Sequence, residues 1–516
     1  MEVNNYKRML RNAGLLYFRM LLTMVVTLYT SRVVLRTLGV DDFGIYHLVA
    51  GFITMLGFLQ GAMSSATQRF LSFELGRSDK NNLTNLFSMS VNIHLLIAMI
   101  ILIAGETAGI WFITTKLTIQ PERIEAARWV FHLSLLAFLI NVISAPYNAL
   151  IIAHERMSIF AWVSLIDVSL KLSIVFMLAW FGIDRLILYA ILMLVVVSII
   201  SLVYMVYCKS KFPESILKLY WDKSLFITMI SYTGWNIWGN VAAVLGNQGI
   251  NVMLNIFFGP AINAARTIAF QVSGALNSFV QNLQIAVNPQ IIKSYASNNF
   301  TYMHQLICYG AKYNFCLLFF LSFPVLLKTR EILELWLGNV PDYTAIFVQL
   351  VIINILIDSI SSPLITAAQA TGKIKVYQTV VGGILLLNLP ISYFLLKINL
   401  DPRSVLFAGI FVSVLALTAR LKILQTLIGL PLNLYLSVVI MRGSAVATAS
   451  AIIILCLNFM PGEVFSSNTA VLITSPFCVL FCTVAFGLDK QERVFIAKKL
   501  KDLLSQLKSR ILPSAG

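Results

Sequence analysis

The sequence is dominated by long, nearly uncharged apolar runs separated by short polar or Gly/Pro-containing breaks. A helix of about 20 such residues crosses the hydrocarbon core of a bilayer. Only helices and closed barrels satisfy their own backbone hydrogen bonds there. The 516 residues are 59% hydrophobic and 12% charged, which is far more apolar than an ordinary soluble protein. The chain is therefore predicted to be an all-α polytopic membrane protein.

Fourteen membrane spans joined by short loops are predicted from these runs. They cover residues 12–36, 43–73, 84–112, 124–152, 158–182, 185–208, 224–257, 261–291, 303–327, 343–370, 374–397, 402–427, 432–459 and 467–487. Lysine and arginine are far more frequent in the loops that share a side with the N-terminus than in the other loops. Because positive flanks stay in the cytoplasm, both termini are predicted to be cytoplasmic.

Two parts of the chain repeat each other in a constant register. Ser144-Ala145-Pro146 aligns with Ser361-Ser362-Pro363, and the segment from Ala153 to Met157 aligns at the same offset with that from Ala370 to Ile374. Six spans separate the copies, so both halves enter the membrane in the same direction, as parallel repeats. The predicted organisation is an N-terminal six-helix lobe at 1–210, a second six-helix lobe at 211–428, two further helices at 429–488 and a cytoplasmic tail at 489–516.

Basic residues lie inside several predicted spans, the clearest being Arg19, Arg69, Lys171, Arg266, Lys312 and Arg442. A cation at membrane depth is costly and usually faces a partner, water or a ligand. An aqueous cavity lined by such cations would favour an anionic cargo. For Arg19 the alternative is a side chain that snorkels to the headgroups. For Lys171 the alternative is neutralisation by Asp167, which lies one helical turn earlier.

Two further titratable residues inside spans are candidates for ion coupling. Asp358 is a carboxylate near the middle of the predicted span 343–370, where reversible protonation would suit a coupling role. Its alternative is an ion pair with Lys312 or Arg442 from another helix. His132 is a candidate proton relay, and a hydrogen bond to a neighbouring helix is its alternative.

Other function classes find little support in the sequence. There is no GxxxxGK[ST], HExxH or GxSxG motif, so no enzyme is predicted. The six cysteines form no CxxC pair, and neither a metal nor a cofactor is expected. The net charge of +16 is assigned to loops rather than to nucleic-acid binding, since no basic aromatic module accompanies it. The tail is predicted to be a basic amphipathic helix on the inner leaflet, with a coiled coil as the alternative.

Three segments of the first half carry a family resemblance: Leu28–Arg32, Leu38–Tyr46 and Ser64–Phe70, extended by Pro146–Ala149 and Ala153–Met157. Here the chain resembles bacterial polysaccharide repeat-unit flippases of the Wzx group. These belong to the multidrug/oligosaccharidyl-lipid/polysaccharide (MOP) exporter superfamily. The resemblance implies fourteen helices in the bacterial plasma (inner) membrane. It also implies that undecaprenyl-pyrophosphate-linked oligosaccharides, such as O-antigen units of lipopolysaccharide, are moved from the inner to the outer leaflet.

The resemblance implies a site as well. Related flippases use a central cationic cavity, so Arg19 and Arg266 are expected to bind the pyrophosphate, with Arg69 and Lys171 beside them. Arg32 is a candidate gate or anchor near the outer end of the first span. The expected mechanism is alternating access between the lobes, with H⁺ or Na⁺ as coupling ion and other polysaccharide assembly proteins as partners.

Two alternatives stay open at this point. A multidrug exporter of the same superfamily should prefer carboxylates in its cavity to bind cationic drugs, and the embedded cations argue against it. A membrane glycan polymerase or ligase would need a sizeable outer loop for its chemistry, and no such loop is visible in the sequence.

Overall fold

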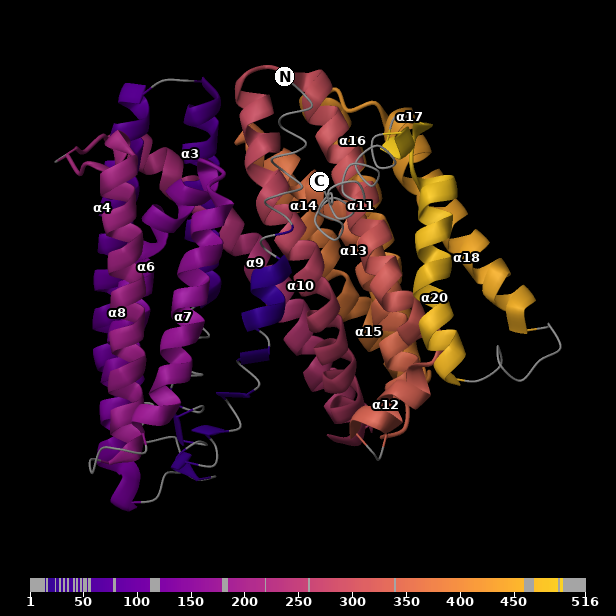
Figure 1. Cartoon of the computed structure of the whole chain (residues 1–516), viewed down its shortest axis with the longest axis horizontal. Helices are drawn as coiled ribbons and strands as arrows, with labels where there is room; N and C mark the ends of the chain where they lie inside the picture. The colour runs from indigo at the N-terminus through magenta and orange to yellow at the C-terminus, as the bar shows by residue number, and fades with distance from the viewer. Residues whose placement is uncertain are drawn as a thin grey trace, which may run out of the picture. The chain divides into compact units, whose positions relative to one another are not determined.

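The computed structural model describes residues 57–77, 80–111, 121–178, 184–218, 220–258, 260–337, 340–458, 468–490 and 492–494, with scattered positions between 14 and 53. Within these residues the regular structure is helical and includes no strand (Figure 1). Ten helices there are long and apolar enough to cross a membrane. The predicted all-α membrane fold is confirmed. Part of the first predicted span, including Arg32, lies outside the described residues.

The helices follow one another with short connections. Their bounds are α3 (Gly57–Arg77), α4 (Lys80–Ala104), α6 (Ile124–Ala153), α7 (Met157–Met177), α8 (Arg185–Lys211), α9 (Lys223–Phe258), α10 (Pro260–Ala296), α11 (Phe300–Leu327), α12 (Thr329–Leu337), α13 (Thr344–Thr371), α14 (Ile374–Leu386), α15 (Asn388–Lys397), α16 (Arg403–Ile428), α17 (Leu432–Tyr435), α18 (Arg442–Asn458) and α20 (Asn468–Cys482). Short π-helical stretches continue α4, α17 and α20. The span predicted at 374–397 is interrupted at Leu387, just ahead of Pro390, because proline lacks the N–H that an unbroken helix needs.

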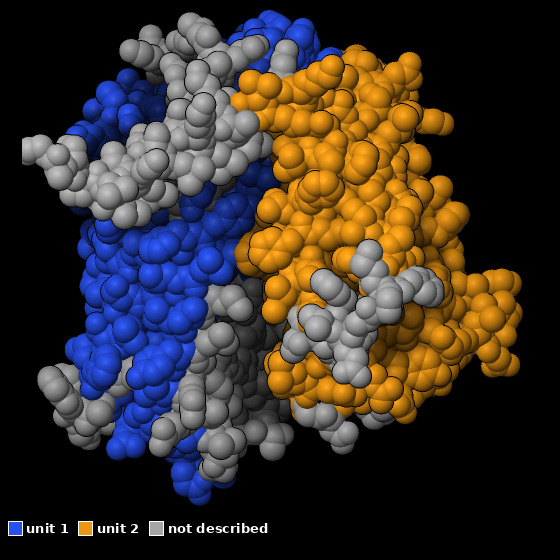
Figure 2. Space-filling view, turned by 45° about the vertical axis from the view of Figure 1, so that its right-hand side comes forward, with its two compact units in different colours: residues 1–248, 281–306, 365–386 blue, residues 249–280, 307–364, 387–516 orange. Residues whose placement is uncertain are grey.

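The chain forms two compact units, each assembled from segments that are far apart in sequence (Figure 2). Unit 1 comprises residues 1–248, 281–306 and 365–386, and unit 2 comprises residues 249–280, 307–364 and 387–516. Unit 1 thus contains segments of both predicted lobes. The lobe boundary at residue 210 stays a prediction.

The central helix of unit 1 is α6, which packs against α3, α4 and α8. Its sequence is apolar around most of its circumference, so neighbours can cover it on several sides. Because lipid tails are as apolar as these side chains, close packing rather than escape from water must hold the helices together. Small residues make that possible, and Ala127, Ala149 and Ala153 of α6 are completely buried.

The core of unit 2 is built around α10, α11 and α13, where Leu318, Phe347 and Ile352 are completely buried. Pro363 lies inside α13 and cannot donate to the carbonyl of Ser359 one turn earlier. The side-chain amide of Asn314, from α11, donates to that carbonyl at 3.2 Å. A neighbouring helix therefore satisfies the acceptor that the proline leaves open, as membrane depth requires.

Several helix ends are fixed by local side-chain chemistry. Asp184 accepts hydrogen bonds from the backbone N–H groups of Leu186 and Ile187 at the start of α8. Asp222 does the same at the start of α9, and the N–H groups of Leu225 and Ser224 lower the pKa of its carboxyl. These caps supply acceptors for N–H groups that have no partner within their own helix.

The outward faces of several long helices are aliphatic. On α4 the exposed side chains include Met99, Ile100 and Ile103, and on α8 they include Leu202 and Val206. In water such faces would form large apolar patches, whereas in a bilayer they meet lipid tails. The structure therefore has lipid-facing surfaces where the sequence predicts membrane spans.

Candidate functional site

Arg69, a predicted cavity cation, instead holds the end of a helix in unit 1. Its Nε donates to the carbonyl of Gln369 at 3.1 Å, and its Nη2 donates to the carbonyl of Ala370 at 2.9 Å. Both carbonyls belong to the last turn of α13, where a positive side chain is favoured. The guanidinium also lies over the rings of Phe70 and Phe73. The Nε and Nη2 donors of Arg69 are therefore used in hydrogen bonds to the protein backbone.

The residue after α13 makes this contact possible. Gly372 has a φ of +72°, in the left-handed region that favours glycine at a helix end. A Cβ placed on it would lie 2.7 Å from Nη2 of Arg69. Glycine is therefore required at this position for its conformation and for the approach of the guanidinium.

Lys171 has a carboxylate partner on its own helix. Its Nζ donates to Asp167 at 2.8 Å along α7, and both side chains are partly exposed. The neutralisation that the sequence offered as the alternative is the arrangement found here. Lys171 therefore contributes less positive charge to its surroundings than its position alone suggests.

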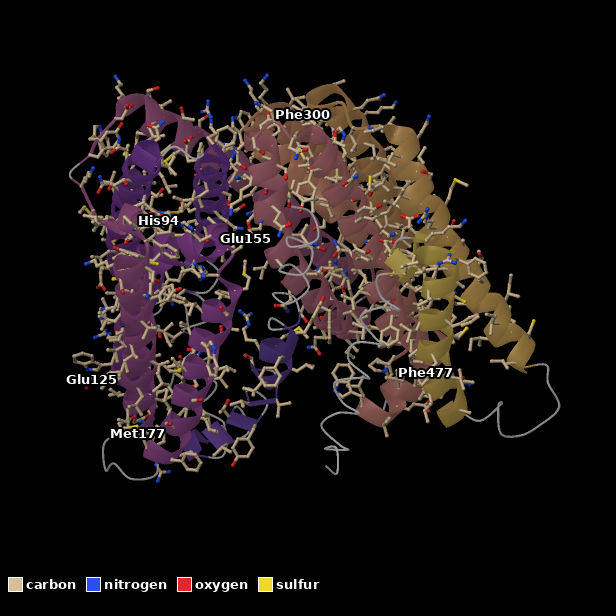
Figure 3. All side chains as sticks on the ribbon, turned by 45° about the horizontal axis from the view of Figure 1, so that its top comes forward. His94, Glu125, Glu155, Met177, Phe300 and Phe477 are labelled. Atoms are coloured by element: carbon tan, nitrogen blue, oxygen red, sulfur yellow. The ribbon has the colours of Figure 1, made fainter. Side chains whose placement is uncertain are left out.

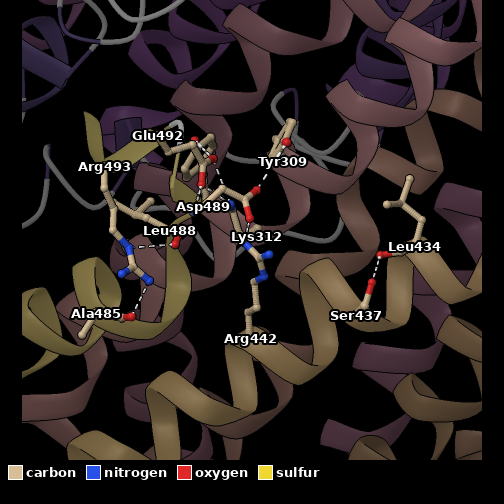
Figure 4. Close-up of polar contacts among 11 residues, drawn as sticks. Tyr309, Lys312, Leu434, Ser437, Arg442, Ala485, Leu488, Asp489, Glu492 and Arg493 are labelled. Atoms are coloured by element: carbon tan, nitrogen blue, oxygen red, sulfur yellow. Dashed lines mark hydrogen bonds and ion pairs between the residues drawn. The ribbon is translucent and has the colours of Figure 1, made fainter. Parts of the chain in front are cut away.

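Lys312 and Arg442 are both bound by carboxylates that follow α20 in unit 2 (Figure 4). The Lys312 side chain is 1% exposed, and its Nζ donates to both oxygens of Glu492 at 2.9 and 2.7 Å. Arg442 forms an ion pair with Asp489. Sequence reasoning missed both pairs, because it assigned residues from Asp489 onward to a cytoplasmic tail.

Asp358 is partly buried in unit 2 and pairs with neither Lys312 nor Arg442, so that alternative was wrong. The amide of Asn354 donates to its carboxylate at 3.0 Å. The hydroxyl of Ser413 and the charge of Arg420, both on α16, also interact with the carboxylate. Asp358 therefore belongs to a polar cluster formed by α13 and α16.

His132 lies in a more exposed position than a proton relay inside a span would need. Its Nδ1 is 3.0 Å from Oε1 of Glu106, and both side chains are more than one-third exposed. The hydrogen bond joins α6 to the π-helical end of α4. A contact between neighbouring helices, the alternative considered for this residue, is what the structure contains.

Arg19 differs from the other embedded cations in unit 1. Its Nη1 donates to Oγ of Ser164 at 3.4 Å, and its guanidinium lies 4.5 Å from the ring centre of Phe160. In the described part of the chain no carboxylate lies within ion-pair distance of Arg19. Most of its N–H donors are therefore not used by the described protein groups.

Arg266, in unit 2, is bound by a neutral group. Its residue is 4% exposed, its Nη1 donates to the side-chain oxygen of Asn251, and its guanidinium lies 4.3 Å from the ring centre of Phe270. The amide and the ring both help to orient the guanidinium. Arg19 and Arg266 lie in different units, and each has its own aromatic support.

A cluster in unit 1 was not found by sequence reasoning. Glu155 has a φ of 57° at the turn between α6 and α7, and its carboxylate accepts from Lys293 at 2.8 Å and from Gln290 at 3.2 Å. Together with Asn299 and Tyr302 these residues line a cavity of about 300 Å³. Figure 3 shows Glu155 and His94 toward one end of unit 1, and Glu125 and Met177 toward the other. The one sequence signal was a glutamate at a break between two apolar runs.

A second missed contact involves Asp42, in the segment Leu38–Tyr46. Asp42 is 6% exposed and forms an ion pair with Arg123, which also pairs with Asp184 at the start of α8. Asp42 therefore has a structural role in that segment, because it binds Arg123 where α6 and α8 begin.

Comparisons with known proteins identify the fold. No protein-family model matches the sequence, and no curated protein matches it. Within the described residues no group of three or more His, Cys, Asp or Glu side chains is placed to hold a metal ion.

The structural matches are extensive although sequence identity is low. The chain is similar to an outward-facing multidrug resistance MATE family transporter of the MOP superfamily, with a TM-score of 0.71, 13% identity, and coverage of 82% of this chain and 96% of that one. A MATE transporter in the bent conformation gives a TM-score of 0.72 with the same identity and coverage. A MOP superfamily transporter from Pyrococcus furiosus, described as having a binding pocket of reverse polarity that suggests a different function, gives a TM-score of 0.69 at 13% identity and equal coverage. The chain therefore has the fold of the MATE transporters of the MOP superfamily.

Proposed function

We propose that this protein moves a polyprenyl-pyrophosphate-linked oligosaccharide from the inner to the outer leaflet of a bacterial plasma membrane during surface polysaccharide biosynthesis. The observation that carries the proposal is the environment of Arg19. Its described contacts are one long hydrogen bond and one aromatic ring. A guanidinium with free N–H groups binds phosphate oxygens in pairs, at a fixed geometry.

Several other embedded cations differ from Arg19 because protein groups bind them more fully. Arg69 is bonded to backbone carbonyls, and Lys171, Lys312 and Arg442 are bonded to carboxylates. Arg266 is the second proposed ligand, and its guanidinium is oriented by contacts with Asn251 and Phe270. The proposed pyrophosphate ligands are therefore Arg19 and Arg266, and Arg69 and Lys171 are left out.

The main rival is multidrug export, which the shared fold also permits. A cation exporter needs carboxylates that can meet its cargo, and several carboxylates in the described spans already lie beside cations. Asp167 is paired with Lys171, and the positive charge of Arg420 acts on Asp358. This charge arrangement favours an anionic cargo over a cationic one.

Alternating access is the proposed mechanism, and unit 1 contains its inner gate. Arg69 binds the end of α13, and Glu155 binds Lys293 of α10, so helices of the first sequence half are tied to helices of the second. With the orientation predicted from the positive loops, these contacts would lie at the cytoplasmic face. Access from the cytoplasm then requires both contacts to break. Asp358 is the proposed site of H⁺ or Na⁺ coupling, and the exposed His132 is a weaker one.

The proposal is tested with purified protein in liposomes that contain a fluorescent undecaprenyl-pyrophosphate-linked oligosaccharide. Translocation is measured as the fraction of glycan that becomes accessible to a soluble glycosidase outside the vesicle. The protein should accelerate this exposure and should not accelerate uptake of ethidium, a cationic drug. Ethidium transport without glycan translocation would instead establish the multidrug exporter.

A further inference from the structure

One helix of unit 2 is long enough to cross a membrane but is unusually polar. α10 has 37 residues, yet it is absent from the ten helices of the described chain that are apolar enough to span. Its N-terminal part belongs to unit 2 and carries Gln271 and Asn277 within a stretch from Thr267 to Gln281 that contains no charged residue. Polar groups at this depth need a reason, since each unsatisfied group in lipid costs several kcal/mol.

The polar residues of α10 lie on one exposed face, beside the exposed Phe270 and Ala275. Thr267, Gln271, Gly274 and Ser278 recur at intervals of three and four, and the first three are exposed while Ser278 is partly exposed. Asn277 flanks this face and is partly exposed. On the opposite side, small and apolar residues such as Ala269 and Leu276 are buried in the unit 2 core. We call Thr267, Gln271, Gly274, Asn277 and Ser278 the amide face.

The amide face has open space at Gly274. A Cβ added to Gly274 would meet no other atom within 4 Å, so the glycine is not there to admit a packed neighbour. Within the described residues the side-chain amides of Gln271 and Asn277 have no hydrogen-bond partner. Both groups therefore have donors and acceptors that are free for a solute.

Lipid-facing helices of the same unit look different. The exposed residues of α16 include Phe407, Phe411 and Val414, and those of α18 include Ile452 and Leu455. The amides of Gln271 and Asn277 cannot replace such side chains against lipid tails without leaving hydrogen-bonding groups unsatisfied. The amide face is therefore suited to contact water and a solute dissolved in it.

Unit 1 contains a helix with the same pattern. On α3 the partly exposed or exposed positions include Gln60, Ser64 and Gln68, which recur every four residues, and Gly61 beside them. A Cβ on Gly61 would meet nothing within 4 Å. Each unit therefore has its own uncharged, amide-bearing helix face.

We infer that the amide face of α10 binds neutral sugar residues of the cargo, a site that rests on the proposed lipid-linked glycan function and deepens it. A side-chain amide both donates and accepts, which matches the paired donor and acceptor of each sugar hydroxyl and acetamido group. A cationic drug would call for carboxylates, and an acidic glycan would call for cations, but the face has neither. The arginine ligands thus bind the pyrophosphate, and the amide face of α10 binds the uncharged sugar residues.

The test compares two probes with purified full-length protein. The first is undecaprenyl pyrophosphate alone, and the second carries a neutral trisaccharide of hexose and N-acetylhexosamine. Affinities are measured by native mass spectrometry or by fluorescence titration in detergent. The variant is Gln271→Leu/Asn277→Leu. The control is Gln425→Leu, which changes an exposed amide in the last turn of α16. Retained binding of the sugar-free anchor also reports that the variant is folded.

The wild-type protein should bind the glycan-bearing lipid more tightly than the bare anchor. The double variant should lose about tenfold or more of that affinity while its affinity for the bare anchor is unchanged. Equal glycan affinity in the variant and the control would overturn the inference and leave the proposed function standing. Tighter binding of a uronic-acid trisaccharide than of the neutral one would also overturn it. Failure of the wild-type protein to bind either lipid would instead overturn the proposed function on which the inference rests.

Discussion

The carboxylate of Glu155 accepts a hydrogen bond from Nζ of Lys293 at 2.8 Å, joining the α6–α7 turn to α10 within unit 1. Glu155 has a left-handed φ of 57°, a conformation that costs an ordinary residue about 1 kcal/mol or more. Its side chain is only 2% exposed. Backbone strain and a buried charge at one residue are typical of a region that switches between two states.

The first prediction is that Glu155→Gln opens the cavity that it lines. Loss of the ion pair should increase the labelling rate of a cysteine placed at Ser297 by about tenfold, in a background without the native cysteines. A membrane-impermeant maleimide measures that rate in liposomes. The charge reversal Glu155→Lys/Lys293→Glu should return it toward the original value. The control Glu334→Gln, at an exposed pair, should leave it unchanged, and a Glu155→Gln rate equal to the control's would refute the gate.

The second prediction concerns Gly372. Alanine there must adopt a φ of +72° and push Nη2 of Arg69 away from the α13 carbonyls, which should destabilise the protein by about 1–3 kcal/mol. The matched control is Gly383→Ala in α14, where a Cβ meets nothing within 4 Å and helix propensity improves. Thermal unfolding in detergent should show a lower Tm for the first variant alone. Equal Tm values would mean that Arg69 does not depend on this glycine.

The third prediction concerns the buried pair between Lys312 and Glu492. Lys312→Met removes one partner and leaves a carboxylate with little access to water, so stability should fall by about 3–5 kcal/mol. Lys312→Met/Glu492→Gln should recover most of that loss. Arg330→Ala breaks a pair whose side chains are 79% and 49% exposed, and should cost no more than about 1 kcal/mol. Denaturant unfolding measures all three, and similar losses in the single and double variants would argue against the pair's role.

The fourth prediction separates coupling from binding at Asp358. Asp358→Asn keeps the size of the side chain and a hydrogen-bonding oxygen, but it cannot exchange a proton. Glycan translocation in liposomes should lose its response to an imposed proton or sodium gradient, while lipid binding stays within about twofold of the wild type. A gradient response that survives in Asp358→Asn would place the coupling site elsewhere.

Local sequence patterns predicted much of the fold and part of the site. The spans follow from the apolar runs, and the pairing of Lys171 with Asp167 follows from their spacing on one helix turn. Each of these depends on residues that are close in the chain. They needed no knowledge of tertiary packing.

The contacts that sequence reasoning missed join residues that are distant in the chain. Lys312 and Glu492 are 180 residues apart, and Arg69 and Ala370 are 301 residues apart, so no local pattern could pair them. The left-handed backbone of Glu155 also has no sequence signature, because glutamate is rarely found there. An embedded cation shows that something must satisfy it. Only the fold shows whether a carboxylate or a carbonyl does so, or whether the cation remains available to a ligand.

The most direct measurement of the central claim is the affinity of Arg19 variants for undecaprenyl pyrophosphate. Because Arg19 has only a 3.4 Å hydrogen bond to Ser164 and a ring contact with Phe160 among the described residues, Arg19→Ala should leave the Tm nearly unchanged. It should weaken binding by about 10- to 100-fold, and Arg19→Lys should fall between the two. If Arg19→Ala binds the lipid as tightly as the wild type, Arg19 is not a pyrophosphate ligand and the account is contradicted.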